Sequence, residues 1–392
     1  MHRPAYKIMI VAGEASGDLH AAKLVSAFRE IASDAELEFF GAAGERMRAA
    51  GVDPVVRADD LSIVGLLEIG RALPMFLRTF SSLKRAAADR KPDAVVLVDF
   101  PDFNLKLAKS LSKLGIKVVY YISPQLWAWR GYRIRSIRKY VDLVISILPF
   151  EKDWYAARGV DHVEYVGSPL AREVHTTESK HDFVRRHSLD PERPIVALLP
   201  GSRHKEIVRI LPVMLGTASQ MSLARSDIQF VVAVASEKNS QDVDWVLRGQ
   251  QVDSSLSLAV VTGETFNALG AADAAAVTSG TATLETGIIG TPLAIVYKTS
   301  SVNYKLLRPL IDVEHFGLIN LIAGERVAAE LIQDDFTPTT LSEELFVLLD
   351  PVENTLRRER LQAAALKLGR GGASKRAAES ILKLMTTPAD SK

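Results

Sequence analysis

Cysteine is missing from the 392-residue chain. Its absence excludes disulfides, zinc sites that use thiolates, and a cysteine nucleophile. Net charge is nearly missing too, because 48 Lys and Arg residues are balanced by 47 Asp and Glu residues. The sequence therefore predicts no general attraction to nucleic acid, and any polyanion must be bound by a local basic patch.

Long hydrophobic runs are also missing. The longest stretch without a charged residue, 210–224, is shorter than the ~20 apolar residues of a membrane-spanning helix and contains Pro212. Near the N-terminus, Gly13 and Glu14 end an apolar stretch before it reaches the length of a secretory signal. We expect a cytoplasmic protein with no segment across a bilayer. No two of the eight histidines are closely spaced as metal ligands, so we expect no zinc site.

Short apolar runs alternate with amphipathic stretches of helical period, which predicts parallel sheets with crossover helices. One set of strands is predicted at 7–12, 37–41, 94–99, 117–122, 143–147 and 163–166. A second set is predicted at 194–199, 230–235, 256–261, 274–277 and 293–297. Beyond Asn320 the pattern becomes helical, with helices predicted at 325–332, 341–349, 354–368 and 373–385.

These patterns predict an α/β protein with two doubly wound, Rossmann-like domains, residues 1–172 and 194–352. The polar stretch 173–193 is predicted to be a linker, and the C-terminal helices of 353–392 are expected to pack back on the first domain. The carboxyl ends of the strands in the two sheets should line a cleft between the domains. Residues that bind ligands should therefore follow strands.

In the first half, a turn at 13–18 and Asp99 follow predicted strands. The glycines of the turn allow a ligand to approach the backbone, or the turn is simply tight, with Asp18 capping a helix. Asp99 ends an otherwise apolar strand, where burial raises a carboxyl pKa and suits a general base, although a structural role is equally consistent. Asp102 is interpreted as a helix cap.

Two further segments of the first half suggest a surface for lipids. Between 122 and 139, two tryptophans accompany five basic residues, Arg130, Arg133, Arg135, Arg138 and Lys139. They suit phosphate groups or an anionic membrane, unless they form a solvated helix face. The segment 61–85 has more apolar residues than one helix stripe needs. It suits acyl chains or a membrane surface, with burial in the core as the alternative.

In the second half, two strands end in small polar residues before a helix begins. Gly201 and Ser202 form a turn suited to phosphate, and Arg203 adds a cation that the helix dipole disfavours unless an anion is bound. Ser279, Gly280 and Thr281 form a similar turn, and Glu285 is suited to ribose hydroxyls. Ordinary helix starts are the alternative for both turns.

Seven motifs, in order along the chain, resemble the lipid-A-disaccharide synthase family. They are GEASGD (13–18), DFPDFN (99–104), SPQLWAWR (123–130), LPFE (148–151), LPGSR (199–203), SGTATLE (279–285) and NLIAG (320–324). The resemblance implies a GT-B glycosyltransferase that inverts the anomeric centre and needs no metal or cofactor. The implied donor is UDP-2,3-diacylglucosamine and the implied acceptor is 2,3-diacylglucosamine 1-phosphate. The products are the β-1,6-linked tetraacyl disaccharide 1-phosphate and UDP.

The resemblance also implies roles for individual residues. Asp99 matches the family's essential aspartate and is expected to be the base for the acceptor 6-hydroxyl, although the sequence leaves Asp102 open. Arg203 matches the arginine of the diphosphate site. The expected donor-binding residues are Gly201, Ser202, Arg203, Ser279, Gly280, Thr281, Glu285 and Asn320, and the expected acceptor-binding residues are Glu14, Ser16, Gly17, Asp18, Asp102, Trp127 and Arg130. Phe100 is bulkier than the residue that the family often has there, which affects packing beside Asp99.

Both substrates carry acyl chains, so we expect a peripheral protein on the anionic inner face of the cytoplasmic membrane, with no nucleic-acid partner. The sequence leaves homo-oligomerisation open. One alternative is another GT-B enzyme for a UDP-N-acetylhexosamine, either a transferase or a 2-epimerase. Another is a non-catalytic protein that binds membranes or polyanions and has no affinity for UDP.

Overall fold

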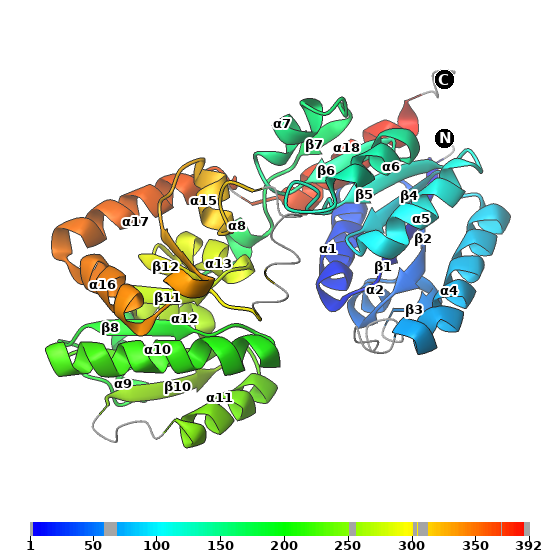
Figure 1. The fold of residues 1–392 in the computed structure, drawn as a ribbon. Coiled ribbons are helices and arrows are strands. Elements are labelled where there is room, and N and C mark those ends of the chain that lie inside the picture. Colours follow the sequence, from blue (N-terminus) through cyan, green and yellow to red (C-terminus); the bar gives the residue numbers. More distant parts are fainter. Residues whose placement is uncertain are drawn as a thin grey trace. The chain divides into compact units, whose positions relative to one another are not determined.

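The structure, a computed structural model, describes residues 3–58, 69–250, 256–300, 304, 313–369 and 371–387; of 69–73 it describes the backbone alone. Two compact units make up the chain. Unit 1 combines Met1–Pro169 with Gly371–Lys392, and unit 2 is Leu170–Arg370. Each unit contains one parallel sheet with helices, so the predicted pair of doubly wound α/β domains is confirmed (Figure 1).

Unit 1 is built on a seven-stranded parallel sheet with the order β3-β2-β1-β4-β5-β6-β7. Its strands are β1 (Ala5–Ala12), β2 (Glu36–Ala43), β3 (Asp53–Arg57), β4 (Ala94–Val98), β5 (Lys117–Tyr121), β6 (Leu143–Ser146) and β7 (Val163–Tyr165). Its helices include α1 (Ala15–Ile31), α2 (Glu45–Ala49), α4 (Ile69–Arg90), α5 (Pro101–Ser112), α6 (Ile134–Tyr140), α7 (Glu151–Ala156) and α18 (Ala373–Thr386).

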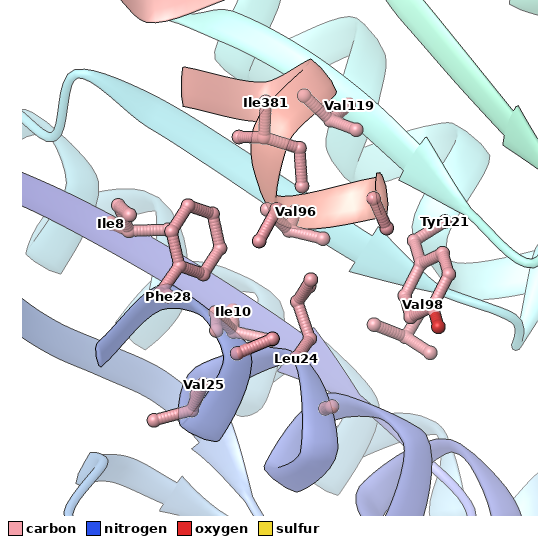
Figure 2. Close-up of a cluster of buried hydrophobic side chains, with 14 of the residues drawn as sticks. Ile8, Ile10, Leu24, Val25, Phe28, Val96, Val98, Val119, Tyr121 and Ile381 are labelled. Atoms are coloured by element: carbon pink, nitrogen blue, oxygen red, sulfur yellow. The ribbon is translucent and has the colours of Figure 1, made fainter. Parts of the chain in front are cut away.

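Both faces of this sheet are buried. Ile8 and Ile10 of β1 point into a core that α1 and α18 cover. Figure 2 shows Phe28 of α1 and Ile381 of α18 among the side chains of this core. The alternate residue Met9 points into the opposite core, which α4, α5, α6 and α7 cover. A strand buried on both faces must be apolar throughout, which explains its uninterrupted hydrophobic sequence.

The structure divides the predicted C-terminal helical region 353–392 between the units. Helix α18 packs against α1, and Lys117 donates from Nζ to the carbonyls of Leu384 and Thr387, both at 2.7 Å. Helix α17 (Pro351–Leu366) belongs instead to unit 2, where it packs against α13, α15 and α16. The last helix of the chain therefore completes the first sheet's core, and the helix before it completes the second unit.

Unit 2 has a six-stranded parallel sheet with the order β10-β9-β8-β11-β12-β13. Its strands are β8 (Ile195–Leu199), β9 (Gln229–Val234), β10 (Leu258–Thr262), β11 (Ala274–Thr278), β12 (Leu293–Tyr297) and β13 (Ala329–Ile332). Its helices include α8 (Leu170–Glu173), α9 (Lys180–Arg186), α10 (His204–Ala224), α11 (Glu237–Gly249), α12 (Thr265–Ala271), α13 (Thr281–Ile289), α15 (Leu318–Ala323), α16 (Pro338–Leu349) and α17. Helices α10, α11 and α16 share one core with this sheet.

Two predicted segments have a different structure. The helix predicted at 325–332 is replaced by strand β13, which pairs with β12. Its Ala and Glu residues favour a helix, but pairing with the sheet edge overrides that weak preference. The linker predicted at 173–193 is part of unit 2. It contains α9, whose Phe183 and Val184 are buried, and the backbone N–H of Thr177 donates to Asn267 at 2.8 Å.

Among the described residues, α10 alone is long and apolar enough to cross a membrane. Most of its apolar side chains, including Ile210, Leu211 and Met214, are buried in the core of unit 2. His204, Lys205 and Glu206 make its first turn polar. We therefore assign α10 to the core of unit 2, because its apolar face already packs against the sheet.

Candidate active site

In each sheet, candidate residues gather at the point where strand order reverses. In unit 2 this point lies between β8 and β11, and in unit 1 between β1 and β4. Open α/β sheets bind ligands at such points, outside the carboxyl ends of the strands, because the chain leaves neighbouring strands in opposite directions there. The turns at 200–203 and 279–280 follow β8 and β11, whereas Gly13 and Asp99 follow β1 and β4.

The reversal point of unit 2 holds a cavity of about 590 Å³. Three turns at the carboxyl ends of β8, β10 and β11 contribute to its wall, together with part of the segment between α8 and α9. Residues that line it are His175, Thr177, Leu199, Gly201, Ser202, Arg203, Glu206, Ala233, Ala235, Gly263, Glu264, Thr265, Phe266, Asn267, Thr278, Ser279, Gly280, Thr281, Ala282 and Glu285. All of these lining residues belong to unit 2.

The first turn of this cavity leads from β8 into α10, with Arg203 as the N-cap. Gly201 has φ +108°, a conformation that side chains rarely adopt, so glycine is required there. Arg203 is 80% exposed, and its Nη1 donates to Oε1 of Glu206 at 2.8 Å. The start of a 21-residue helix offers backbone N–H groups and a positive dipole end, which together with Arg203 suit an anion.

The second turn leads from β11 into α13, with Gly280 as the N-cap at φ +153°. Ser279 donates from Oγ to the carbonyl of Phe316 at 2.8 Å, which fixes the start of the turn. Glu285 is half-buried one turn into the helix, and burial raises its carboxyl pKa. A carboxylate beside small residues can accept hydrogen bonds from the hydroxyls of a sugar.

The third turn, 263–264, leads from β10 into α12, and neither it nor the start of α12 was predicted as part of the site. Asn267 accepts from Thr177 N at 2.8 Å, and Arg186 of α9 forms an ion pair with Glu264. These contacts join the turn to the segment that the sequence suggested was a linker. The sequence signal was weak, because the turn has one glycine and no charge pattern typical of a binding motif.

In unit 1, Asp99 immediately follows β4 in a left-handed conformation. Its φ is +47° and that of Phe100 is +48°, and two consecutive non-glycine residues of this kind are uncommon. The surroundings hold this backbone in place, because the Asp99 carbonyl accepts from Asn104 Nδ2 and Tyr120 Oη, both at 2.7 Å. The chain thus fixes Asp99 at the reversal point of the sheet.

The Asp99 side chain has the electrostatics of a base. Burial raises the pKa of its carboxyl, and the negative charge of Glu14 raises it further. A carboxylate with a raised pKa takes a proton from a hydroxyl more readily than an ordinary one. The bulky ring of Phe100 lies against Gly13, where an added Cβ would come within 2.5 Å of it, and also packs on Phe76 and Phe103. The Phe100 ring therefore fills the space between Gly13 and the aromatic rings of Phe76 and Phe103.

Asp102 has a different environment from Asp99. It lies in the first turn of α5, its side chain is 68% exposed, and it forms ion pairs with Arg130 and Arg133. The N-cap of α5 is Phe100, so Asp102 is not the cap. Its charge is already balanced by two cations, which favours Asp99 as the base.

Comparison with known proteins identifies the family. A family model described as lipid-A-disaccharide synthetase matches residues 8–384. The chain belongs to the lipid-A-disaccharide synthase family. A lipid-A-disaccharide synthase from Myxococcus xanthus is 43% identical over 382 residues, with 97% of each chain covered. One from Syntrophus aciditrophicus is 43% identical over 379 residues, 96% of this chain and 97% of the relative. Glycosyl transfer in lipid A synthesis is thus the activity of this family and of this chain.

Solved structures agree on the fold. A putative UDP-N-acetylglucosamine 2-epimerase from Listeria monocytogenes superimposes with a TM-score of 0.65 at 15% identity, with 97% of each chain covered. MurG from Acinetobacter baumannii gives 0.57 at 15% identity, covering 97% of this chain and 100% of the other. At such identities the likeness shows the fold alone, which is GT-B. The predicted fold class is therefore confirmed. The 2-epimerase, one of the alternatives, has the same fold, but the family match is to lipid-A-disaccharide synthase.

The structure brings together seven of the eight predicted donor-binding residues, since all except Asn320 line the cavity of unit 2. Asn320 is buried and fully hydrogen-bonded. Its Nδ2 donates to Ala328 O and Glu330 Oε1, both at 2.9 Å, and its Oδ1 accepts from the backbone N–H groups of Val327 and Ala328. No bonding capacity remains for a nucleotide, so the structure assigns Asn320 to joining α15 to β13.

The predicted acceptor-binding set divides in two. Glu14 and Ser16 are exposed, Glu14 is close enough to Asp99 for its charge to raise the Asp99 pKa, and Arg130 pairs with Asp102. By contrast, Asp18 is buried and accepts hydrogen bonds from the backbone N–H groups of Gly44, Arg46 and Met47. It therefore caps α2, and neither caps α1 nor is available to bind the acceptor substrate. Gly17 is also buried, next to Ala12 and Val98.

Trp127 is the other exception. Its ring is 6% exposed, packs edge-on against Phe150, and donates from Nε1 to Glu151 Oε1 at 3.1 Å. Ser123 donates to the same oxygen at 3.0 Å. Trp127 therefore anchors the 123–130 segment in the core, and its exposed neighbour Trp129 faces solvent with Arg130 over its ring. Within the described ranges, no group of three or more His, Asp or Glu side chains is placed to hold a metal ion.

Proposed function

We propose that this chain transfers 2,3-diacylglucosamine from UDP-2,3-diacylglucosamine to the 6-hydroxyl of 2,3-diacylglucosamine 1-phosphate. The products are the β-1,6 tetraacyl disaccharide 1-phosphate and UDP. The observation that carries the proposal is the cavity of unit 2, where Gly201, Ser202 and Arg203 form an anion site opposite the Ser279–Thr281 turn. A UDP co-structure of MnaA from S. aureus, with a TM-score of 0.64 at 13% identity over 99% of this chain, has the same fold.

In this proposal the cavity binds the donor through its nucleotide. The backbone N–H groups of the 201–203 turn and the Arg203 guanidinium bind the diphosphate, and Glu285 accepts from the ribose hydroxyls. As the bond from the sugar to the diphosphate breaks, negative charge grows on UDP. The same cationic turn stabilises that charge more strongly than it stabilises the bound donor, which lowers the barrier.

Asp99 supplies the other half of the chemistry. Its carboxylate takes the proton of the acceptor 6-hydroxyl while that oxygen bonds to the anomeric carbon from the face opposite UDP. One carbon–oxygen bond forms and one breaks, the proton goes to Asp99, and the electron pair leaves with the diphosphate. Attack from the opposite face inverts the anomeric centre.

Arg203→Ala should weaken UDP binding and slow transfer. Loss of one charge-assisted contact costs ~1.5 to 3 kcal/mol, which is roughly 10- to 150-fold in Kd. Isothermal titration with UDP measures the effect. Arg248→Ala is the matched control, because Arg248 is an exposed arginine of α11 outside the cavity. Unchanged UDP affinity in Arg203→Ala would place the diphosphate elsewhere, and no affinity in the wild type would favour a non-catalytic module.

We also propose that the protein is peripheral to the cytoplasmic face of the inner membrane, where amphiphilic substrates reside. Residues 61–68 of the predicted 61–85 surface, and the side chains of 69–73, lie outside what the structure describes. In α4, Phe76 and Phe80 pack on Phe103 rather than facing solvent, whereas Leu77 is 60% exposed. Of the five basic residues, Arg130 and Arg133 pair with Asp102, so Arg135, Arg138 and Lys139 are better placed for anionic head groups.

Changing Leu66, Leu73 and Leu77 to Ser should lower sedimentation with anionic vesicles. Each leucine that enters the acyl boundary contributes ~1.5 kcal/mol or more, so the partition coefficient should fall at least roughly tenfold. The control changes Leu223, Val352 and Leu366, three exposed apolar residues of unit 2, to Ser. Equal loss in both variants, or no loss in either, would contradict the assignment of this segment to the membrane.

A further inference from the structure

Glu206 occupies the anion site of the unit 2 cavity with its own carboxylate. It is the third residue after the N-cap of α10, and its side chain is 15% exposed in the cavity wall. Oε1 accepts from Arg203 Nη1 at 2.8 Å, and Oε2 accepts from the backbone N–H of Ser202 at 3.3 Å. These two donors are the ones assigned above to the diphosphate.

The turn is shaped around this carboxylate. A Cβ at Gly201 would lie 2.7 Å from Glu206 Oε2 and 2.9 Å from Glu206 Cβ, closer than real Cβ contacts allow. Glycine at this position therefore serves two needs, the φ of +108° and the room for the Glu206 side chain to fold back over the turn. The turn thus provides both the space and two hydrogen-bond donors for one carboxylate.

A carboxylate there is favourable only while no other anion is present. The helix dipole and Arg203 stabilise its negative charge in the empty site. A diphosphate that binds the same two donors brings more negative charge to the same place, and the two anions repel each other. The carboxylate and the diphosphate are therefore alternative occupants of one site.

We infer that Glu206 is the resident counter-ion of the diphosphate site, which the donor displaces and which returns as UDP leaves. This inference rests on the proposed function. Glu206 acts through Arg203 and Ser202, so it is a positioning residue. In the empty enzyme it holds the Arg203 side chain at the cavity, and after transfer it competes with UDP for the two donors. It thereby keeps product from binding too tightly.

Glu206→Gln tests this with UDP and uridine as probes. The amide keeps the shape of the side chain but loses the charge, so UDP should bind about fivefold tighter or more, whereas uridine, which has no phosphate, should bind as in the wild type. Product inhibition of transfer by UDP should strengthen by the same factor. If Glu206 served packing alone, the substitution would change the melting temperature but would not change the affinity for UDP relative to that for uridine.

The matched control is Glu237→Gln, which removes a carboxylate from the first turn of α11, outside the cavity, and should leave UDP affinity unchanged. In an Arg203→Ala background, Glu206→Gln should tighten UDP binding less, because one of the two released donors is gone. If the single variant is unstable, Arg203→Ala with and without Glu206→Gln still tests the inference, because UDP should bind more tightly to the double variant.

Unchanged or weaker UDP binding by folded Glu206→Gln would overturn the inference, because Glu206 would then be neutral or would help to bind the diphosphate. Equal tightening of uridine would also overturn it, by moving the effect to the nucleoside. Failure of the proposed function is distinguishable: it would appear as no UDP binding by the wild type, or as UDP binding without formation of the disaccharide, whereas only the ratio of variant to wild type tests Glu206.

Discussion

Asp99→Asn should lower kcat by ~100- to 10,000-fold and leave UDP affinity nearly unchanged. Asparagine keeps the shape of the side chain and tolerates the left-handed φ of +47°, so the backbone of the turn should persist. The amide cannot accept the proton of the acceptor hydroxyl. Because the residues that line the donor cavity all belong to unit 2, the substitution removes none of them. Single-turnover transfer, with titration of UDP on the same preparation, measures both effects.

Asp102→Asn is the matched control, since Asp102 follows the same strand but is exposed and paired with Arg130 and Arg133. It should lose much less activity than Asp99→Asn. The raised pKa of Asp99 should also appear as an acidic limb in the pH profile of kcat/KM, above the ordinary range of aspartate. A folded Asp99→Asn protein with most of its kcat, or a larger loss in Asp102→Asn, would remove Asp99 from the role of base.

Glu151→Gln should make the free energy of unfolding of unit 1 fall less as pH rises. Glu151 is fully buried, and burial raises its pKa from 4.5 to about 7, against hydrogen bonds from Trp127 and Ser123 that favour the charged form. The folded chain therefore holds this proton more tightly than the unfolded chain does. Between about pH 4.5 and 7 its contribution to stability falls as pH rises, and above 7 the loss is complete.

A pKa rise from 4.5 to about 7 corresponds to at most about 3.5 kcal/mol. Glutamine stays neutral, so the variant should resemble the wild type at pH 5 and exceed it in unfolding free energy at pH 8.5. Urea unfolding followed by tryptophan fluorescence suits this test, because Trp127, Trp129 and Trp154 all lie in unit 1. Glu36→Gln, at an exposed carboxylate of β2, is the control. If the unfolding free energies of Glu151→Gln and wild type changed in parallel with pH, Glu151 would not be held neutral in the folded protein.

The sequence predicted the parts of the site that depend on local pattern. Asp99 stood out because five apolar residues precede it, and the Gly201–Arg203 turn because small residues separate an apolar run from a helix. Both patterns arise from the alternation of strand and helix, which places polar residues at the carboxyl ends of strands. The alternation does not give the order of the strands, since β3 and β4 follow each other in sequence but are separated by β2 and β1 in the sheet.

The parts that depend on distant partners could not be predicted. Asp18 lies in a turn typical of ligand binding, but its three donors are N–H groups of the 44–47 segment, more than 25 residues away in sequence. Trp127 lies in a motif with exposed Trp129, and only the structure shows that Trp127 is buried, against Phe150 and Glu151. In both cases the sequence shows a polar or aromatic side chain without showing what satisfies it.

The transfer reaction itself tests the central claim most directly. Wild-type protein is incubated with UDP-2,3-diacylglucosamine and radiolabelled 2,3-diacylglucosamine 1-phosphate in mixed micelles, and the products are separated and their linkage determined. The proposed function predicts a β-1,6 tetraacyl disaccharide 1-phosphate with one UDP released for each disaccharide, and loss of both products in Asp99→Asn. Conversion of UDP-N-acetylglucosamine alone, with no disaccharide from the acylated pair, would contradict it.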